Sequence, residues 1–285
     1  MRKIIGIAGA GTMGNGIALS AALAGNNVNL YDMASEYLEK AKGAVKSNLD
    51  YLVGKSKMSQ SESDETLSRI NFTDKLNDCV GEIIIEAIVE KLEVKQSLFS
   101  QLALINKPDS IFASNTSSLS ISKIQEGILN EERVAGLHFF NPAQVMKLVE
   151  VVKGNKTSDK TIKELCEFAI SLGKTPVVCT DSPGFIVNRV ARHFYLEAMH
   201  IVESGEATFE EVDEILEASG FKMGPFKLMD MIGMDINLAV SQSLYEAFDN
   251  AIRFKPSQLQ IEKVKISELG RKTGKGFYNY HTSKL

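Results

Sequence analysis

A histidine and a glutamate stand in two apolar segments separated by a few residues. His138 lies near the end of RVAGLHFF, just before Asn141-Pro142, and Glu150 lies inside KLVEVV. A carboxylate within a buried strand needs a charged or hydrogen-bonding partner to offset its desolvation, and an imidazole can be that partner. Such a pair raises the basicity of the histidine and stabilises the imidazolium during proton transfer. These residues predict general acid/base chemistry; the alternatives are a core histidine and an outward-facing glutamate on an edge strand.

A phosphate-binding turn is predicted near the amino terminus, between an expected strand and an expected helix. The pattern G-x-G-x-x-G is formed by Gly9, Gly11, Thr12, Met13 and Gly14. The first glycine permits the tight turn, the second lets the backbone approach a pyrophosphate, and the third lets helix and strand pack closely. The helix amino terminus then offers free N–H groups to the phosphates. A purely structural turn is the alternative.

An acid after the next expected strand favours NAD over NADP. Asp32 follows Gly14 by 18 residues, where a carboxylate accepts hydrogen bonds from the adenosine ribose. The same carboxylate would repel a 2′-phosphate. Met33, Ala34 and Ser35 offer no arginine to hold such a phosphate.

Five small polar residues in a row follow the apolar run SIFA. They are Ser114, Asn115, Thr116, Ser117 and Ser118. Capping of the next helix accounts for at least one of them, because these residue types are strong N-caps. Capping does not require all five, and their place at the carboxyl end of a strand predicts a hydroxyl that faces a substrate.

Two further groups of polar residues are ambiguous from the sequence alone. Asn188 and Arg189 lie about one turn into the helix expected after Ser182-Pro183-Gly184, where a solvated helix face is the simpler interpretation. Lys55 and Lys57 lie in a polar stretch where lysines are usually solvated charges. A phosphate-rich ligand tail would also use them.

The elements that must position these residues alternate between strands and helices. Strands are expected at residues 4–7, 28–30, 81–88, 110–114, 133–140, 147–152 and 175–180. Helices are expected at residues 13–24, 35–53, 92–105, 119–128 and 159–173. This alternation predicts an α/β fold of Rossmann type, with a doubly wound, mainly parallel sheet covered on both faces.

A change of composition divides the chain near residue 184. Strand-like runs end there, and helices are expected at residues 185–205, 209–220 and 234–248. A smaller all-α C-terminal domain, residues 184–285, therefore follows a Rossmann domain, residues 1–183. Residues 36–69 of the first domain are expected to form a helical hairpin insertion with an exposed polar tip at 55–65.

Composition excludes several classes of protein. The 285 residues carry 32 basic and 36 acidic side chains, a net charge of −4, so a nucleic-acid partner is not expected. Cys79, Cys166 and Cys179 show no metal-ligand spacing, which predicts no metal site and favours a reducing compartment. No window holds 18 uncharged apolar residues, so we expect no membrane partner and a cytoplasmic location.

The order of several sequence blocks resembles that of a known family. The blocks are GAGTMGNGIA, EAIVE, ASNTSSLSI, GLHFFNPAQVMKLVEVV, DSPGFIVNR, MGPFKLMDMIGMD and GRKTGKGFYNY. Together they resemble the short, single-function L-3-hydroxyacyl-CoA dehydrogenases from end to end, with the closest likeness to bacterial 3-hydroxybutyryl-CoA dehydrogenases. The resemblance implies hydride transfer between NAD and a short (S)-3-hydroxyacyl-CoA, in butyrate formation or fatty-acid metabolism. It also implies a homodimer or higher homo-oligomer through the C-terminal domain.

The resemblance implies a role for individual residues. His138 would be the catalytic base and Glu150 its carboxylate partner. The substrate oxygens would be met by Ser117 and Asn188. Further implied contacts are those of Glu90, Lys95 and Asn115 with NAD, of Asn141 with the nicotinamide and the acyl-CoA, and of Lys55 with the coenzyme A phosphates.

Two positions depart from the family pattern. Gln144 replaces the proline or small residue often found after HFFNPA, and Leu196 replaces a common asparagine. Both departures concern acyl-chain preference or helix packing rather than the reaction. Two other functions are the alternatives: a dehydrogenase for free hydroxyacids, which would use a catalytic lysine, and a non-catalytic NAD-binding sensor.

Overall fold

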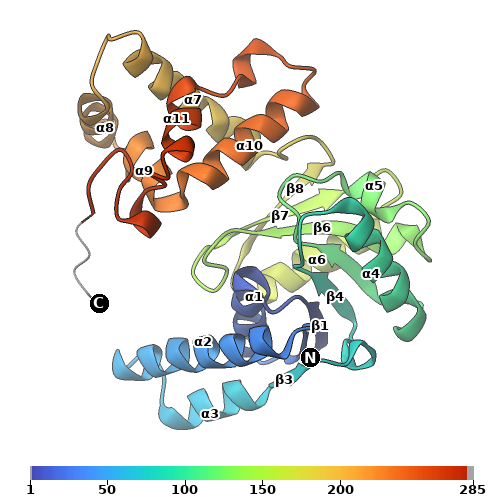
Figure 1. The fold of residues 1–285 in the computed structure, drawn as a ribbon. Helices are drawn as coiled ribbons and strands as arrows, with labels where there is room; N and C mark the ends of the chain where they lie inside the picture. Colours follow the sequence, from blue (N-terminus) through green and yellow to red (C-terminus); the bar gives the residue numbers. More distant parts are fainter. Residues whose placement is uncertain (1, 281–285) are drawn as a thin grey trace. The chain divides into compact units, whose positions relative to one another are not determined.

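The computed structural model describes residues 2–280. Internal contacts divide the chain into two compact units, residues 1–182 and 183–285 (Figure 1). Each unit has its own apolar core, and each is described by itself.

The first unit is built on one eight-stranded sheet, with the order β3-β2-β1-β4-β5-β6-β7-β8. The strands are β1 (Ile4–Ala8), β2 (Asn27–Tyr31), β3 (Ile70–Thr73), β4 (Ile83–Glu86), β5 (Ile111–Ser114), β6 (Val134–Phe139), β7 (Leu148–Lys153) and β8 (Thr175–Thr180). Neighbouring strands are parallel except for β6 and β7, which are antiparallel. The predicted doubly wound, mainly parallel sheet is therefore confirmed.

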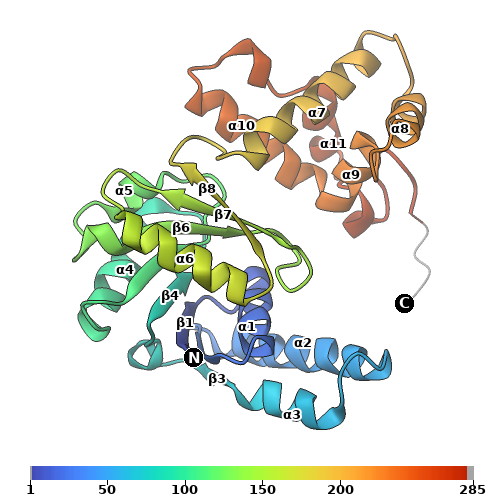
Figure 2. The same ribbon diagram turned by 180° about the vertical axis from the view of Figure 1, so that it is seen from behind.

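Helices cover both faces of this sheet (Figures 1 and 2). They are α1 (Thr12–Leu23), α2 (Ser35–Gly54), α3 (Gln60–Ser68), α4 (Leu92–Ile105), α5 (Ile121–Gln125) and α6 (Asp159–Ser171), with short 3-10 turns η1 (Leu76–Asp78) and η2 (Glu131–Arg133). Apolar side chains of α1, α2 and α6 join one core cluster with alternate residues of the central strands. On the other face, the ring of Phe99 from α4 contacts that of Phe112 from β5, with centroids 5.8 Å apart.

The helical hairpin has a shorter tip than the sequence indicated. Helix α3 begins directly after Ser59, whose hydroxyl accepts from the amide of Glu62 while the Glu62 carboxylate accepts from the amide of Ser59. This capping box makes a helix of residues 60–65, which the polar composition had assigned to the tip. The turn between the two helices is accordingly confined to residues 55–59.

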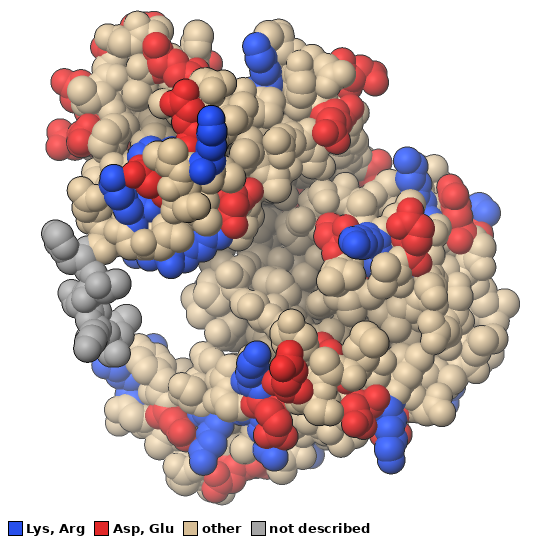
Figure 3. All heavy atoms as spheres, in the orientation of Figure 1, with Lys and Arg blue, Asp and Glu red and all other residues tan. Residues whose placement is uncertain are grey.

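The second unit is helical within its described residues. Its elements are α7 (Val187–Glu203), α8 (Phe209–Ala218), α9 (Pro225–Ile232), α10 (Met234–Ala247), η3 (Ile252–Phe254), α11 (Gln258–Lys265) and η4 (Arg271–Thr273). In neither unit does a described helix have the length and apolar character needed to cross a bilayer. On the face drawn in Figure 3, acidic and basic side chains lie intermixed on each unit.

Two buried carboxylates, one on α8 and one on α9, hydrogen-bond the segment at residues 277–278 of the second unit. Asp213 is fully buried and accepts from the amides of Phe226 and Lys227 and from the Tyr278 hydroxyl, at 2.8–3.0 Å. Asp230, at 1% exposure, accepts from the amides of Phe277 and Tyr278. Buried donors need these acceptors, because an unpaired polar group in the interior is costly.

We predict that Asp213→Ala lowers the free energy of unfolding by roughly 3 kcal/mol, since it leaves three donors without their acceptor. Glu214→Ala, an exposed position on the same helix, is the control, with an expected change within about 0.5 kcal/mol. Urea titration followed by circular dichroism measures both. Equal effects of the two substitutions would show that the Asp213 hydrogen bonds do not stabilise this unit.

Candidate active site

The glycine turn has the geometry of a phosphate cradle. Gly9 follows β1 with φ +105°, a conformation that disfavours other residues. A Cβ atom at Gly14 would lie 1.7 Å from the Gly9 carbonyl oxygen, so close packing of α1 on β1 requires glycine there. A Cβ atom at Gly11 would meet nothing within 4 Å, and the backbone is therefore accessible at this position.

Asp32 ties this turn to the end of β2. Its Oδ2 accepts from the amide of Ala10 at 2.8 Å, and its Oδ1 accepts from the amide of Ala34 at 3.0 Å. The side chain lines a cavity of about 770 Å³ beside the switch point between β1 and β4. The apolar part of the lining comes from Met33, Ile88, Val94 and Leu98, among other residues. The glycine turn fits the pyrophosphate of a dinucleotide, the Asp32 carboxylate fits its ribose and the apolar wall fits its adenine.

His138 and Glu150 are paired, as the sequence indicated. They stand directly opposite each other in the antiparallel β6–β7 ladder, with Nδ1 of the imidazole 2.8 Å from Oε2 of the carboxylate. The residues are 6% and 1% exposed, and β7 lies between β6 and β8 rather than at the edge of the sheet. The ring of Phe140 lies against the imidazole, with centroids 4.5 Å apart. The arrangement can stabilise a positive charge on His138.

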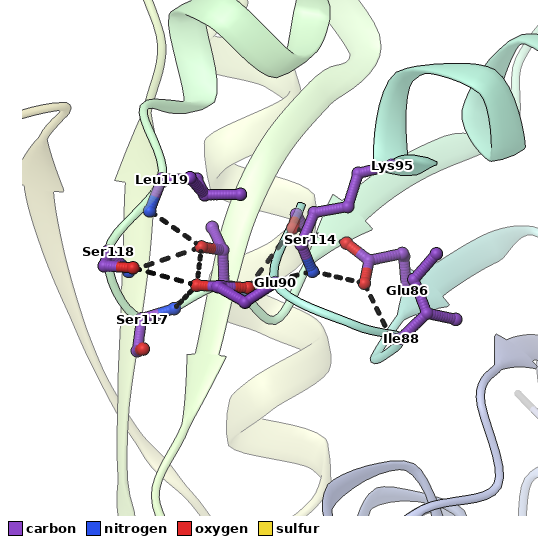
Figure 4. A network of polar contacts seen from close by, with 9 residues as sticks. Glu86, Ile88, Glu90, Lys95, Ser114, Ser117, Ser118 and Leu119 are labelled. Carbon is purple, nitrogen blue, oxygen red and sulfur yellow. Dashed lines mark hydrogen bonds and ion pairs between the residues drawn. The ribbon is translucent and has the colours of Figure 1, made fainter. Parts of the chain in front are cut away.

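A buried lysine joins two carboxylates near the ends of β4 and β5 (Figure 4). Lys95 Nζ lies 2.5 Å from Glu86 and 3.1 Å from Glu90, and the Lys95 and Glu86 side chains are at most 1% exposed. Glu86 also accepts from the Ser114 hydroxyl at 2.7 Å and from the amide of Ile88 at 2.8 Å. Ion pairing and hydrogen bonds thus satisfy a carboxylate that has no access to water.

The second carboxylate of this cluster holds the polar segment after β5. Glu90 Oε1 accepts from the Thr116 hydroxyl, from the amide of Ser117 at 3.1 Å and from the Ser118 hydroxyl at 3.1 Å (Figure 4). Burial acts to raise the pKa of Glu90. The positive charge of Lys95 and these hydrogen bonds outweigh burial and hold the pKa below its ordinary value. Glu90 is therefore a fixed negative charge that orients the backbone at Ser117.

The other residues indicated by the sequence have different surroundings. Asn115 Oδ1 accepts from the amide of Phe139 at 2.9 Å and so joins the ends of β5 and β6. Asn141 is exposed just after β6, and the Lys55 amine lies over the Tyr51 ring, 5.7 Å from its centroid. Asn188 is half-buried near the start of α7 and belongs to the second unit.

The two departures from the family pattern have clear contacts. Gln144 Nε2 donates to Asn48 Oδ1 on α2 at 3.3 Å. Leu196 packs against the apolar core of the second unit. The Gln144 contact packs the loop after β6 against α2, and the Leu196 contact packs α7 within the helical unit.

Sequence reasoning missed Glu86. The signal was present, because a carboxylate that ends the apolar run IIIE needs a partner for the same reason as Glu150. Lys95 was expected to contact NAD, and the structure buries its ammonium group between two acids. Residues 2–280 contain no cluster of three or more His, Cys, Asp or Glu side chains suited to a metal ion.

Comparison with known families gives a match to each unit. Residues 4–182 match the family model described as 3-hydroxyacyl-CoA dehydrogenase, NAD binding domain. Residues 184–280 match the model described as 3-hydroxyacyl-CoA dehydrogenase, C-terminal domain.

Individual relatives agree with these matches. The chain is 45% identical to 3-hydroxyadipyl-CoA dehydrogenase of Escherichia coli (strain K12); the match covers 99% of this chain but 60% of that protein. It is 40% identical to a probable 3-hydroxybutyryl-CoA dehydrogenase of Deinococcus radiodurans, over 96% of this chain and 99% of the relative. The crystal structure of (S)-3-hydroxybutyryl-CoA dehydrogenase from Ralstonia eutropha superposes with a TM-score of 0.94 at 39% identity, over 99% of this chain and all of the other.

We predict that Lys95→Met destabilises the first unit by about 3–5 kcal/mol, because it leaves the buried Glu86 carboxylate without its cation. The double variant Lys95→Met/Glu86→Gln should recover part of this loss, since the amide is neutral. Lys91→Met, at an exposed position just before α4, is the control. Thermal and urea unfolding measure all three. A single variant as stable as the control would refute the role given to the ion pair.

Proposed function

Since the chain belongs to the 3-hydroxyacyl-CoA dehydrogenase family, we propose that it interconverts (S)-3-hydroxyacyl-CoA and 3-oxoacyl-CoA with NAD as the hydride carrier. The observation that carries this proposal is the buried His138–Glu150 pair, because His138 and the glycine turn lie at the carboxyl ends of the parallel strands β6 and β1. A short acyl chain is favoured, with 3-hydroxybutyryl-CoA and acetoacetyl-CoA as the reacting pair. The names of the Deinococcus and Ralstonia relatives support this choice.

The acid/base pair moves one proton in each turnover. In the oxidative direction His138 accepts the proton of the C3 hydroxyl group; NAD, when bound, would supply the hydride acceptor for C3. Because Nδ1 faces Glu150, Nε2 is the nitrogen that exchanges this proton. Glu150 keeps the ring orientation fixed and stabilises the positive imidazolium. In the reductive direction His138 returns the proton to the carbonyl oxygen.

Other residues hold the cofactor. The glycine turn would bind the pyrophosphate of NAD, and Asp32 would accept hydrogen bonds from the adenosine ribose, which favours NAD over NADP. Glu90 and Asn115 would contact NAD, as the family resemblance implies. Lys95 is too deeply buried to contact the cofactor, so we assign it to orienting Glu90.

The substrate contacts rest on the family resemblance and on local geometry. Ser117 hydrogen-bonds the reacting oxygen, and the Glu90 carboxylate orients its backbone. Asn188 is assigned to the reacting carbonyl, Asn141 to the acyl-CoA and Lys55 to the coenzyme A phosphates. We propose that the reaction belongs to butyrate formation or to fatty-acid metabolism.

Self-association through the C-terminal domain is part of the proposal. Val190, Met231 and Ile236 are each about half exposed or more on the second unit, and exposed apolar side chains favour association between copies. We also propose a cytoplasmic location, which the three free cysteines support.

We predict that His138→Ala lowers kcat by about 10² to 10⁴ and leaves NADH binding unchanged, because it removes the base and not the cofactor site. The assay is oxidation of NADH by acetoacetyl-CoA, followed at 340 nm, with free acetoacetate as the substrate control. His200→Ala, at an exposed position at the end of α7, should keep native turnover. Near-native turnover of His138→Ala would overturn the assignment. Absence of turnover in the native protein that still binds NADH would favour the sensor function.

We predict that Asp32→Ala weakens NADH binding by about tenfold or more, because a charge-assisted hydrogen bond to the ribose is lost. Discrimination against NADPH should fall at the same time, since the negative charge that repels its phosphate is gone. Fluorescence titration with both nucleotides measures the change, with Asp109→Ala as the exposed control. An unchanged NADH to NADPH ratio would contradict the role of Asp32.

A further inference from the structure

The loop that joins β6 to β7, residues 140–147, borders the acid/base pair. It begins with Phe140, whose ring lies against the His138 imidazole, and continues with Asn141. The strand ladder fixes His138 opposite Glu150, but its hydrogen bonds end at Phe139 and Val149. Other contacts must therefore determine where Phe140 and Asn141 lie.

A buried lysine supplies the strongest of these contacts. Lys174 precedes β8 and is 8% exposed. Its ammonium group donates to the carbonyl oxygen of Ala143 at 2.6 Å and to that of Met146 at 2.9 Å. The Ser20 hydroxyl of α1 donates to the same Ala143 oxygen at 3.2 Å. The loop is thus held through its backbone from two elements of the first unit.

Within residues 2–280, no carboxylate lies within ion-pair distance of the Lys174 nitrogen. The ammonium group therefore interacts with the carbonyl groups of this loop and not with an acid. Burial lowers the pKa of the lysine, which shows that its position disfavours the charge. Hydrogen bonds from a charged donor are about twice as strong as neutral ones, so they can offset the cost of burying the ammonium group. These bonds are directed at two carbonyl groups of one loop.

The loop has little internal structure to replace this support. The amides of Val145 and Met146 both donate to the carbonyl oxygen of Pro142, at 2.9 Å, and form a single turn. The Gln144 side chain adds one longer hydrogen bond to Asn48. Removal of the lysine would leave the Met146 carbonyl without its donor and the Ala143 carbonyl with one neutral donor.

We propose that Lys174 is a positioning residue for the reaction: it holds the β6–β7 loop so that Phe140 stays against His138 and Asn141 stays at the substrate. This inference rests on the function proposed above. Lys174 takes no part in the proton transfer, and its effect is transmitted through the loop backbone.

The test compares Lys174→Met with Lys163→Met. Lys163 lies on α6, its side chain is 78% exposed, and its ion pair with Glu167 is long, at 3.9 Å. Two properties are measured well below the unfolding temperature: steady-state kinetics with acetoacetyl-CoA and NADH, and hydrogen exchange of the Val145 and Met146 amides. Fluorescence titration gives the Kd for NADH.

Lys174→Met should lower kcat/KM for acetoacetyl-CoA by about tenfold or more, with the Kd for NADH within about twofold of native. Both amides should lose protection, and Lys163→Met should match the native protein in every property. A merely structural lysine would lower the unfolding temperature and leave kcat/KM unchanged, which overturns the proposal. Retained protection in Lys174→Met overturns it as well.

A second variant covers the case in which Lys174→Met does not fold. Ser20→Ala removes the neutral donor from Ala143 and should give a smaller loss in the same direction, about twofold to fivefold in kcat/KM. No change in kinetics or exchange would then overturn the proposal. Absence of turnover in the native protein refutes the proposed function instead, and exchange at Val145 and Met146 alone then decides whether Lys174 holds the loop.

Discussion

Burial of charge under the carboxyl ends of the strands is the constraint on which the site depends. Glu86, Lys95 and Glu150 are almost completely removed from water, and each such charge must find a partner of fixed geometry. The partners come from different strands and helices, so satisfying one charge also fixes the elements around it. Glu86 and Lys95 join β4, β5 and α4, and Glu150 joins β7 to the imidazole on β6. The same contacts that prevent an unpaired buried charge hold His138 and the segment after β5 in place.

The alternation of apolar runs was sufficient to predict the α/β class, because strands and helices of this length bury their apolar faces in one known way. It did not predict β3, α9 or α11. The strand INFT has two apolar residues in four, and α11 is mostly polar, so neither shows a clear period. Helix α9 follows Gly224 and begins with Pro225, a pair that resembles a loop until the buried Asp213 carboxylate is seen to cap it.

Partnership between His138 and Glu150 was predictable from desolvation, since both residues have apolar neighbours in the chain. Their alignment was not predictable, because it depends on the antiparallel pairing of β6 with β7 inside a mostly parallel sheet. Burial of Lys95 and of Lys174 was equally hidden. Lysines in the sequence usually have solvated amines, and only the packing of distant elements turns the ammonium groups of these two residues inward.

Location of the His138–Glu150 pair within one unit also affects the order in which the chain can fold during synthesis. The glycine turn, the His138–Glu150 contact and the Glu86–Lys95 cluster all lie in residues 1–182. Ribosomes make this segment first, and multidomain chains generally fold from the amino-terminal domain onward. The chain order therefore allows the nascent polypeptide to form the His138–Glu150 and Glu86–Lys95 contacts before the helical unit is translated. Stability of these buried contacts can in this way be selected separately from changes in the later helices.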